Sequence, residues 1–504
     1  MLLIHPPLAK PCEPPAGIPL LAGALRQNGL NCTVLDANME GILALLGMKP
    51  ASESDTWTRR AGRNLAANLA SLRSWPLYRN PSRYHRAVSD VNRILEVAGR
   101  SHGLTVSLAN YQDPLLSPLK SGDLFRAWQS PQENIFYPYF SKRLPQVLDQ
   151  AQPGMVGLSL NYLSQANVAL AMAGFIKQHF PGLPVVLGGG LVTSWMRHPG
   201  WQNPLSGLVD HLVAGPGEGP LLDLLGGGPA GASAHYCPDY TGLPLVEYLA
   251  PGFILPYAAS SGCYWQKCSF CPELAEKNPY RPVPVPQVLA DIARLTEETR
   301  PALIHFLDNA VSPALMRGLM EHPLGVPWYG FSRIVPELAD SAFCRKLKAS
   351  GCLMLKLGLE SGDQSVLDGT DKGTDIALVS ASLKALAETG IATFVYLLFG
   401  TPAESLAEAR RTMDFVVKHH WAISFLNLAI FNMPISSPEA GGLATGTFYE
   451  GDLSLYTDFE HPRGWDRQAI RRFLDEEFKR HPAIDTILKR LPPIFTSNHA
   501  PFFV

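Results

Sequence analysis

Short apolar runs alternate with amphipathic stretches over the first part of the chain. The alternation predicts strands joined by helices, which indicates a parallel, Rossmann-like sheet within residues 1–228. Strands are predicted at residues 1–5, 32–35, 155–160, 184–187 and 211–214. Amphipathic periodicity predicts helices between them at residues 20–28 and 166–179, the first ending at Gly29. Residues 6–19 are rich in proline, which predicts a loop.

A second strand–helix alternation occupies residues 251–445. About six strand–helix units in succession are typical of a partial or full (β/α) barrel. Strands are predicted at residues 254–259, 302–306, 328–331, 354–359, 393–399 and 423–430. Helices are predicted between them at residues 283–297, 312–321, 341–350, 377–388 and 406–419.

Three segments lie outside these alternations. Residues 45–145 predict a helical insertion, with helical periodicity at 57–74 and 84–98. The Gly- and Pro-rich residues from 226 onward predict a linker over 229–250. Residues 446–504 predict a small C-terminal extension that is helical at 466–480.

Composition and charge exclude several classes of protein. The 504 residues contain 46% hydrophobic and 17% charged residues, which excludes general disorder. Lys and Arg number 42 against 44 Asp and Glu, so there is no basic surplus for nucleic acid. No apolar run approaches the roughly 20 residues of a membrane helix, and the N-terminal pattern is not that of a secretory signal. We therefore expect no membrane partner and a cytoplasmic location.

Three of the eight cysteines, Cys263, Cys268 and Cys271, lie within nine residues directly after the first strand of the second alternation. Three thiolates on one loop can ligate three irons of a 4Fe–4S cluster and leave the fourth iron open. Zinc is an alternative, but no nearby Cys or His offers the fourth ligand that a structural zinc site needs. A chance grouping of core cysteines is the other alternative. The remaining five cysteines are predicted to be packing residues.

Several predicted strands of residues 1–228 end in polar or glycine-rich turns. These turns are at residues 36–41, 159–164, 188–193 and 215–219. Carboxyl ends of parallel strands meet at one edge, where ligands bind, and glycine allows a ligand to approach the backbone closely. The turns predict a bulky cofactor, and ordinary tight turns are the alternative.

With Phe270 before the last cysteine of the group and Ser-Gly before the first, the chain resembles the cobalamin-binding radical S-adenosylmethionine (SAM) enzymes. The spacing is C-x4-C-x2-C, one residue longer than the family's usual C-x3-C-x2-C. The resemblance covers most of the chain. It implies an N-terminal Rossmann-like cobalamin-binding sheet with a helical insertion, a radical SAM partial (β/α)6 barrel and a C-terminal extension.

The resemblance also implies the site residues of the barrel. Cys263, Cys268 and Cys271 would ligate a 4Fe–4S cluster whose open iron binds SAM, and cleavage of SAM would generate a 5′-deoxyadenosyl radical. Candidate SAM contacts follow the later strands at Asp308, Arg333, Glu360, Ser361 and Gly400.

For the N-terminal sheet, residues 36–41 match the D-x-H-x-x-G motif of many cobalamin proteins, with Asn38 in place of the histidine. This predicts cobalamin bound without a histidine below the cobalt. The candidate cobalamin contacts are Asn38, Ser159, Tyr162, Ser164, Gly188, Gly189, Gly190, Gly217 and Glu218.

The resemblance implies methylation of an unactivated carbon or phosphorus centre of a small molecule or peptide, with an external electron donor such as flavodoxin or ferredoxin. Radical rearrangement or cyclisation and aminocarboxypropyl transfer are alternatives, and a non-catalytic corrinoid- or metal-binding module is an alternative of another class. Weaker site candidates are Cys12, Glu13, Tyr264, Trp265, Gln266, Asn498 and His499.

Overall fold

A computed structural model describes residues 1–48, 55–227, 235–493 and 499–504. The fold divides into two compact units. The first contains Met1–Ile254 and Tyr449–Leu455, and the second contains Leu255–Phe448, Tyr456–Pro492 and residues 499–504. Residues 229–234 of the expected linker and the candidate Asn498 lie outside the described residues. No helix of the described ranges is long and apolar enough to cross a membrane.

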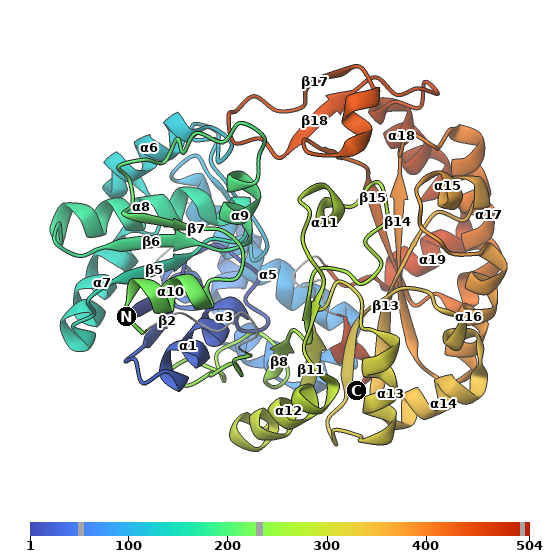
Figure 1. The fold of residues 1–504 in the computed structure, drawn as a ribbon, viewed down its shortest axis with the longest axis horizontal. Helices are drawn as coiled ribbons and strands as arrows, with labels where there is room; N and C mark the ends of the chain where they lie inside the picture. Colours follow the sequence, from blue (N-terminus) through green and yellow to red (C-terminus); the bar gives the residue numbers. More distant parts are fainter. Residues whose placement is uncertain (49–54, 228–234, 494–498) are drawn as a thin grey trace. The chain divides into compact units, whose positions relative to one another are not determined.

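The first unit is built on a five-stranded parallel sheet with the order β2-β1-β5-β6-β7, and three of its strands, β5 to β7, are seen side by side in Figure 1. All five predicted strands are confirmed, as β1 (Leu2–His5), β2 (Thr33–Asp36), β5 (Val156–Ser159), β6 (Val185–Gly188) and β7 (His211–Val213). Their connecting helices are α1 (Gly17–Gln27), α2 (Ala37–Leu46), α8 (Leu163–His179), α9 (Gly190–Met196) and α10 (Glu218–Leu224).

Two local predictions in this unit were wrong. Residues 36–41 are not a free turn, because β2 runs directly into α2 and the Asp36 carboxylate caps that helix by accepting from the Met39 backbone N–H. Helix α1 begins at Gly17, inside the predicted loop. Pro19 is tolerated there because the first-turn N–H groups of a helix have no intrahelical acceptor.

The segment between β2 and β5 is mainly helical, and the predicted helices at 57–74 and 84–98 are confirmed as α3 and α5. Its elements are α3 (Thr56–Leu72), α4 (Trp75–Tyr78), α5 (Pro81–Arg100), β3 (Thr105–Val106), β4 (Tyr111–Gln112), α6 (Ser121–Gln129), η1 (Pro131–Glu133) and α7 (Tyr137–Ala151). Tyr449–Leu455 packs with this segment, where Asp452 accepts a 2.8 Å hydrogen bond from the Ser121 backbone.

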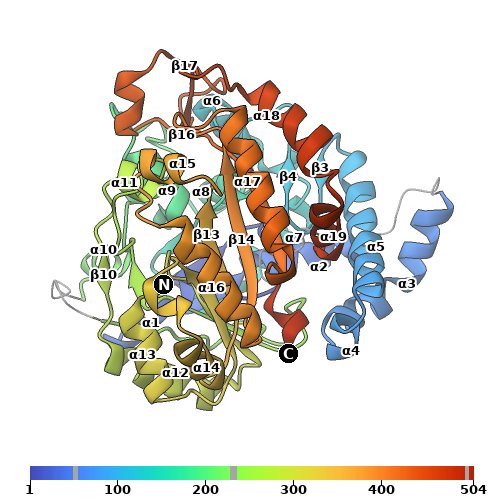
Figure 2. The same cartoon turned by 90° about the vertical axis from the view of Figure 1, so that its right-hand side faces the viewer.

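The second unit contains a six-stranded sheet with the order β15-β14-β13-β12-β11-β8, in which β11 to β15 pair in parallel. All six predicted strands are confirmed, as β8 (Ile254–Tyr257), β11 (Leu303–Phe306), β12 (Trp328–Ser332), β13 (Cys352–Glu360), β14 (Ala392–Phe399) and β15 (Phe425–Ile430). The sheet is covered by α12 (Val285–Thr299), α13 (Pro313–Glu321), α14 (Ser341–Ala349), α16 (Ile376–Glu388) and α17 (Leu406–His419). Figure 2 shows α16 and α17 in front of β13 and β14.

Short elements complete the second unit. These are β9 (Ser260–Ser261), α11 (Pro272–Ala275), β10 (Arg281–Pro282), η2 (Pro336–Ala339), α15 (Gln364–Gly369), η3 (His420–Ala422), β16 (Met433–Pro434), η4 (Pro438–Gly442), β17 (Thr445–Thr447) and β18 (Tyr456–Phe459). The predicted tail helix is confirmed as α18 (Arg467–Phe473) and the π-helical η5 (Leu474–Phe478), followed by α19 (Pro482–Arg490) and η6 (Ala500–Phe503).

The two faces of this sheet bury different partners. On the outer face, Phe399 of β14 contacts Phe473 and Phe478, with ring centroids 6.1 and 5.4 Å away. On the inner face, the ring of His499 lies 4.7 Å from that of Phe394 and 4.8 Å from that of Phe425. Phe394 and Phe425 are in register with each other in the amino-terminal halves of β14 and β15, so His499 packs against this part of the inner face.

Helix α8 approaches helix α6 too closely for any side chain at Gly174. A Cβ built there would lie 1.9 Å from the Trp128 carbonyl oxygen, whereas one built at Gly122 of α6 meets nothing within 4 Å. We expect Gly174→Ala to lower the free energy of unfolding of the first unit by about 1–3 kcal/mol, because a packed backbone must shift.

The matched variant Gly122→Ala should leave that free energy unchanged or raise it slightly, because alanine favours an exposed helix. Urea unfolding followed by far-UV circular dichroism measures both. Equal unfolding midpoints for the two variants would show that the α6–α8 contact is not close.

Candidate functional site

The cysteine loop, defined here as Cys263–Cys271, connects β9 to α11 at the carboxyl end of β8. Pairing of β9 with β10 brings the chain back beside the start of the loop. Gly262 has φ +70°, and a Cβ there would lie 2.4 Å from the Pro279 carbonyl oxygen, so only glycine fits. Gln266, within the longer first spacing, also adopts a left-handed conformation at φ 50°. Cys268 is buried, and Cys263 and Cys271 are half-buried.

Two cations lie beside the buried cysteine. The Arg333 guanidinium, which follows β12, has Nη1 3.6 Å from the Cys268 Sγ and also donates to the Lys372 carbonyl oxygen. Burial raises the pKa of the Cys268 thiol, and the charges of Lys372 and Arg333 oppose that effect. Burial also raises the pKa of Cys271, to about 11. Metal binding to this loop therefore has to displace thiol protons, and the neighbouring cations favour the thiolate that results.

Trp265, within the loop, contacts Arg333 and a further cation, Lys267. Its ring lies 4.2 Å from the Arg333 guanidinium carbon and 4.8 Å from Lys267 Nζ, and its indole N–H donates to the Asp371 carbonyl oxygen. Gln266 is exposed and donates to the Asn278 carbonyl oxygen. Trp265 therefore packs the loop against Arg333 and Asp371, and Gln266 faces solvent.

The donor set fits an iron–sulfur cluster. Three cysteines on nine residues, with an arginine beside one sulfur, match a group that is bound through thiolates and carries negative charge. Among the described residues, no three His, Cys, Asp or Glu side chains are grouped so that they could bind one metal ion. A 4Fe–4S cluster does not require that grouping, because each cysteine ligates a different iron.

Asp308, predicted to contact SAM, uses its carboxylate within the second unit. It accepts from the Ala259 backbone N–H at 3.0 Å and from the Ser260 hydroxyl, which joins β11 to the segment before the cysteine loop. Burial raises the pKa of this carboxyl to about 6, and the two hydrogen bonds oppose that effect. Asp308 therefore positions the segment that leads into the cysteine loop.

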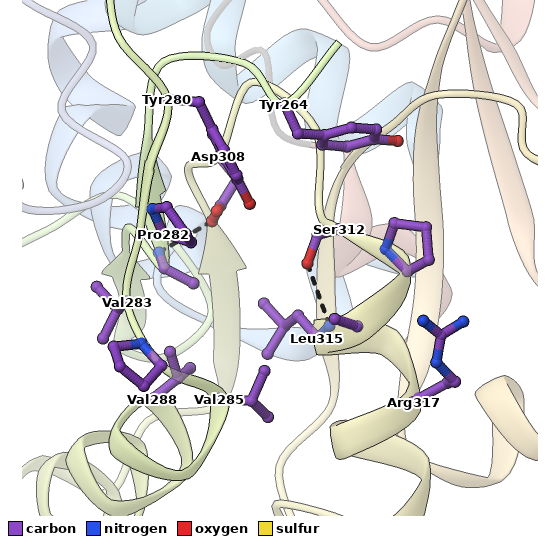
Figure 3. Close-up of a pocket in the computed structure, with 14 residues that line it drawn as sticks. Tyr264, Tyr280, Pro282, Val283, Val285, Val288, Asp308, Ser312, Leu315 and Arg317 are labelled. Carbon is purple, nitrogen blue, oxygen red and sulfur yellow. Dashed lines mark hydrogen bonds between the residues drawn. The ribbon is translucent and has the colours of Figure 1, made fainter.

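Asp308 also lines a cavity of about 560 Å³ shown in Figure 3. In that view Asp308 lies beside Tyr280, while Arg317 lies at the far side. The weaker candidate Tyr264 lines the same cavity, and burial raises its pKa to about 12. The remaining wall is mainly apolar, formed by Ala259, Pro282, Val283, Pro284, Val285, Val288, Pro313, Ala314 and Leu315, with Ser312.

Glu360 and Ser361 diverge at the end of β13. The strand has a bulge between Gly358 and Glu360, and Glu360 has φ 67°. Glu360 forms a 2.8 Å ion pair with Lys372, whereas the Ser361 hydroxyl lies 2.9 Å from the Thr412 hydroxyl of α17. The structure therefore brings Glu360 toward Lys372 and the cysteine loop, and directs Ser361 to the covering helix.

Gly400 begins the turn after β14 with φ +86°. Its backbone N–H donates to the Glu404 carboxylate at 2.6 Å, and the Trp465 indole N–H donates to the same oxygen at 3.0 Å. Burial raises the pKa of Glu404 to about 7. Sequence reasoning missed Glu404 and Lys372. The signal for Glu404 was a carboxylate four residues after the strand-end glycine.

In the first unit, the strand order makes β1 and β5 neighbours although they are far apart in sequence. The strand order reverses between β1 and β5, and in open parallel sheets ligands bind at the carboxyl ends of the two strands where this reversal occurs. Near that point the Ser164 hydroxyl donates to the Leu8 carbonyl oxygen at 2.8 Å, and the Ser159 hydroxyl accepts from Asn161 at 3.1 Å. Asn161 also accepts from the Gly190 backbone N–H, so it connects two of the predicted turns.

The other candidate cobalamin residues lie at the same edge. Gly188 ends β6, and Gly189 has φ +110° with the Leu160 carbonyl oxygen 2.4 Å from where a Cβ would be. Gly217 and Glu218 begin α10, and Tyr162 is 58% exposed. These placements are compatible with a ligand above the edge, and the contacts stay predictions.

Asn38 is buried in the first turn of α2, where its amide oxygen accepts a 2.8 Å hydrogen bond from the Ala9 backbone. The side chain at the position of the motif's histidine therefore binds the loop after β1. This arrangement fits a corrinoid that takes no ligand to cobalt from residue 38. The loop residue Cys12 is buried, and Glu13 is half-buried.

Comparison with known proteins gives matches among solved structures. No family model matches the chain, and no curated protein sequence matches it significantly. The radical SAM methyltransferase TsrM from Kitasatospora setae, with cobalamin and a [4Fe–4S] cluster bound, superposes with a TM-score of 0.54 and 15% identity, over 98% of this chain and 91% of that chain.

Two further structures are similar. TsrM with tryptophan substrate and a SAM analogue has a TM-score of 0.53 and 16% identity over 89% of this chain and 79% of that one. The cobalamin-dependent radical SAM enzyme OxsB with aqua-cobalamin has a TM-score of 0.50 and 15% identity over 67% of this chain, which spans only 60% of OxsB. This chain therefore has the fold of the cobalamin-dependent radical SAM enzymes.

Proposed function

We propose that this protein is a cobalamin-dependent radical SAM methyltransferase that acts on an unactivated carbon or phosphorus centre of a small molecule or peptide. The observation that carries the proposal is the cysteine loop at the carboxyl end of β8, with Arg333 3.6 Å from Cys268. The fold shared with TsrM, which is described as a methyltransferase, favours methylation among the reactions open to this fold.

The bound cofactors would supply one-electron chemistry and a transferable methyl group. Cys263, Cys268 and Cys271 would ligate the cluster. Arg333 and Lys372 place positive charge beside it, and Glu360, paired with Lys372, offers a carboxylate to the amino or hydroxyl groups of SAM. Asp308 positions the start of the cysteine loop through Ala259 and Ser260.

Replacing a substrate hydrogen by the methyl group of SAM leaves S-adenosylhomocysteine. When the hydrogen leaves as an atom, a second SAM and two electrons are consumed, and 5′-deoxyadenosine and methionine are formed. An external reductant, a flavodoxin- or ferredoxin-like donor, would supply the electrons.

The first prediction concerns the fate of the SAM methyl group. Anaerobically reconstituted enzyme with hydroxocobalamin, a reductant and methyl-deuterated SAM should yield S-adenosylhomocysteine and a substrate product heavier by the labelled methyl group. Incubation with a panel of small molecules and peptides, followed by mass spectrometry, detects both. Omitting cobalamin should abolish the labelled product.

Two results would contradict methylation. An unlabelled product formed with 5′-deoxyadenosine indicates rearrangement or cyclisation, and methylthioadenosine with a product enlarged by an aminocarboxypropyl group indicates the other transfer. Labelled product formed equally well without cobalamin would remove the corrinoid from the proposal.

The second prediction concerns Glu404, a positioning residue that acts through Gly400. Glu404→Ala leaves the Gly400 N–H without its acceptor and should raise the KM for SAM by about ten-fold, the effect of losing one charge-assisted hydrogen bond. Glu404→Gln retains an accepting oxygen and should keep the KM near that of the wild type. Initial steady-state rates of SAM cleavage at varied SAM concentration measure the KM of each protein.

The dependence of stability on pH, compared between wild type and Glu404→Gln, gives a second test of this residue. The folded pKa of Glu404, about 7, lies above the usual value of 4.5, so the folded state binds more protons between these pH values. This carboxyl therefore costs stability as the pH rises from 4.5 to 7. The glutamine variant should gain stability relative to wild type over that interval. A pH-independent difference, or equal KM values for the alanine and glutamine variants, would contradict the role assigned to Glu404.

A further inference from the structure

A lysine is buried in the inner face of the second sheet. Lys356 lies in the middle of β13 and is 1% exposed. In the parallel register it lies beside Phe331 of β12 and Phe394 of β14. Its Nζ is 2.9 Å from Nε2 of His305 on β11. Burying a lysine ammonium is costly, so its position in the centre of a sheet calls for a functional explanation.

The surroundings of Lys356 favour a positive charge. As an ammonium group Lys356 can only donate, and His305 Nε2 would then be the acceptor in this contact. Nζ also lies 4.8 Å from the Phe331 ring centroid and 5.3 Å from that of Tyr329. The His305 ring stacks on Tyr329 with centroids 4.4 Å apart and an interplanar angle of 13°. Aromatic faces stabilise a cation, and the stack fixes the imidazole that orients it.

The rings around Lys356 differ in exposure. Phe394, in register with Lys356, and Phe425, in register with Phe394, are buried against His499. Phe331, also in register with Lys356, and Tyr396, two residues farther toward the carboxyl end of its strand, are partly exposed, with ring centroids 5.0 Å apart. Lys356 therefore lies beside both a buried group of rings and a partly exposed aromatic pair.

Two of the charged groups near the carboxyl ends have partners of their own. Glu360 is paired with Lys372, and Arg333 contacts the cysteine loop. Along the inner face, Glu360 lies at the carboxyl end of β13, Tyr396 lies nearer the middle of the sheet, and Lys356 lies farther toward the amino ends, in register with Phe331. This order suits a ligand with an apolar body and an anionic end.

We propose that Lys356, oriented by His305, binds a carboxylate of the substrate, whose flat apolar part lies against Phe331 and Tyr396. The inference rests on the proposed function, because it takes the inner face of this sheet as the substrate site. It narrows the substrate to a small organic acid or to a peptide that offers a carboxylate.

Binding of matched acids and amides to reconstituted holoenzyme tests the proposal. The probes are indole-3-acetate with indole-3-acetamide, phenylacetate with phenylacetamide, and L-tryptophan with L-tryptophanamide, measured by equilibrium dialysis with SAM present. Wild type should bind the acid of at least one pair about ten-fold more tightly than its amide, as expected for a buried charge-assisted contact. Lys356→Met should reduce that ratio to about one, and Lys356→Arg should retain most of it.

Lys346→Ala, which removes an exposed lysine of α14, is the matched control and should keep the wild-type ratio. Iron content and melting temperature establish that each variant is folded. If Lys356→Met does not fold, His305→Gln decides, because it leaves the charge but removes its orientation and should lower the ratio several-fold.

Three results would overturn the proposal. These are no preference for any acid in wild type, an unchanged preference in Lys356→Met, or a loss of SAM affinity in that variant with the acid preference retained. The last result would assign Lys356 to the carboxylate of SAM. A Lys356-dependent acid preference without methyl transfer would refute only the proposed function, and labelled product from a neutral substrate in Lys356→Met would refute only this inference.

Discussion

The buried guanidinium of Arg333 is the contact on which the candidate catalytic centre depends. It contacts the Cys268 sulfur, the Trp265 ring and the Lys372 carbonyl oxygen, and so connects the cysteine loop to β12 and to the segment after α15. A guanidinium remains charged, so its burial is stable only with partners of this kind. Lys372 continues the contact to Glu360 at the end of β13. The carboxyl ends of β8, β12 and β13 thereby contribute to one polar site around the cysteines.

Much of this fold could be predicted from the pattern of apolar positions. Strands β8 and β11 to β15 are each a short apolar run, and for this reason all of them could be predicted from the sequence. The cysteine loop could be predicted because its three ligands are close in sequence. Arg333 and Glu360 follow strand ends, and the topology of parallel sheets places such residues at one edge.

The remaining parts depend on contacts that periodicity does not encode. Lys372 and Glu404 act through partners on other loops, and only the folded chain shows these pairs. The bulge between Gly358 and Glu360 changes the alternation of side chains, which explains why Ser361 meets Thr412 instead of Lys372. In the sequence, Lys356 is a single polar residue within an apolar run. Its contact with His305 could be found only once the register of β11, β12 and β13 was known.

We propose above all that the loop Cys263–Cys271 binds a 4Fe–4S cluster with an iron open to SAM. Electron paramagnetic resonance of the anaerobically reconstituted, dithionite-reduced protein tests it most directly, with Cys268→Ala and the buried Cys344→Ala of α14 compared alongside. About four irons per chain are expected, together with a reduced-cluster signal whose g values shift when SAM is added, in wild type and Cys344→Ala but not in Cys268→Ala. A wild-type protein without that signal, or a signal that Cys268→Ala retains unchanged, would contradict it.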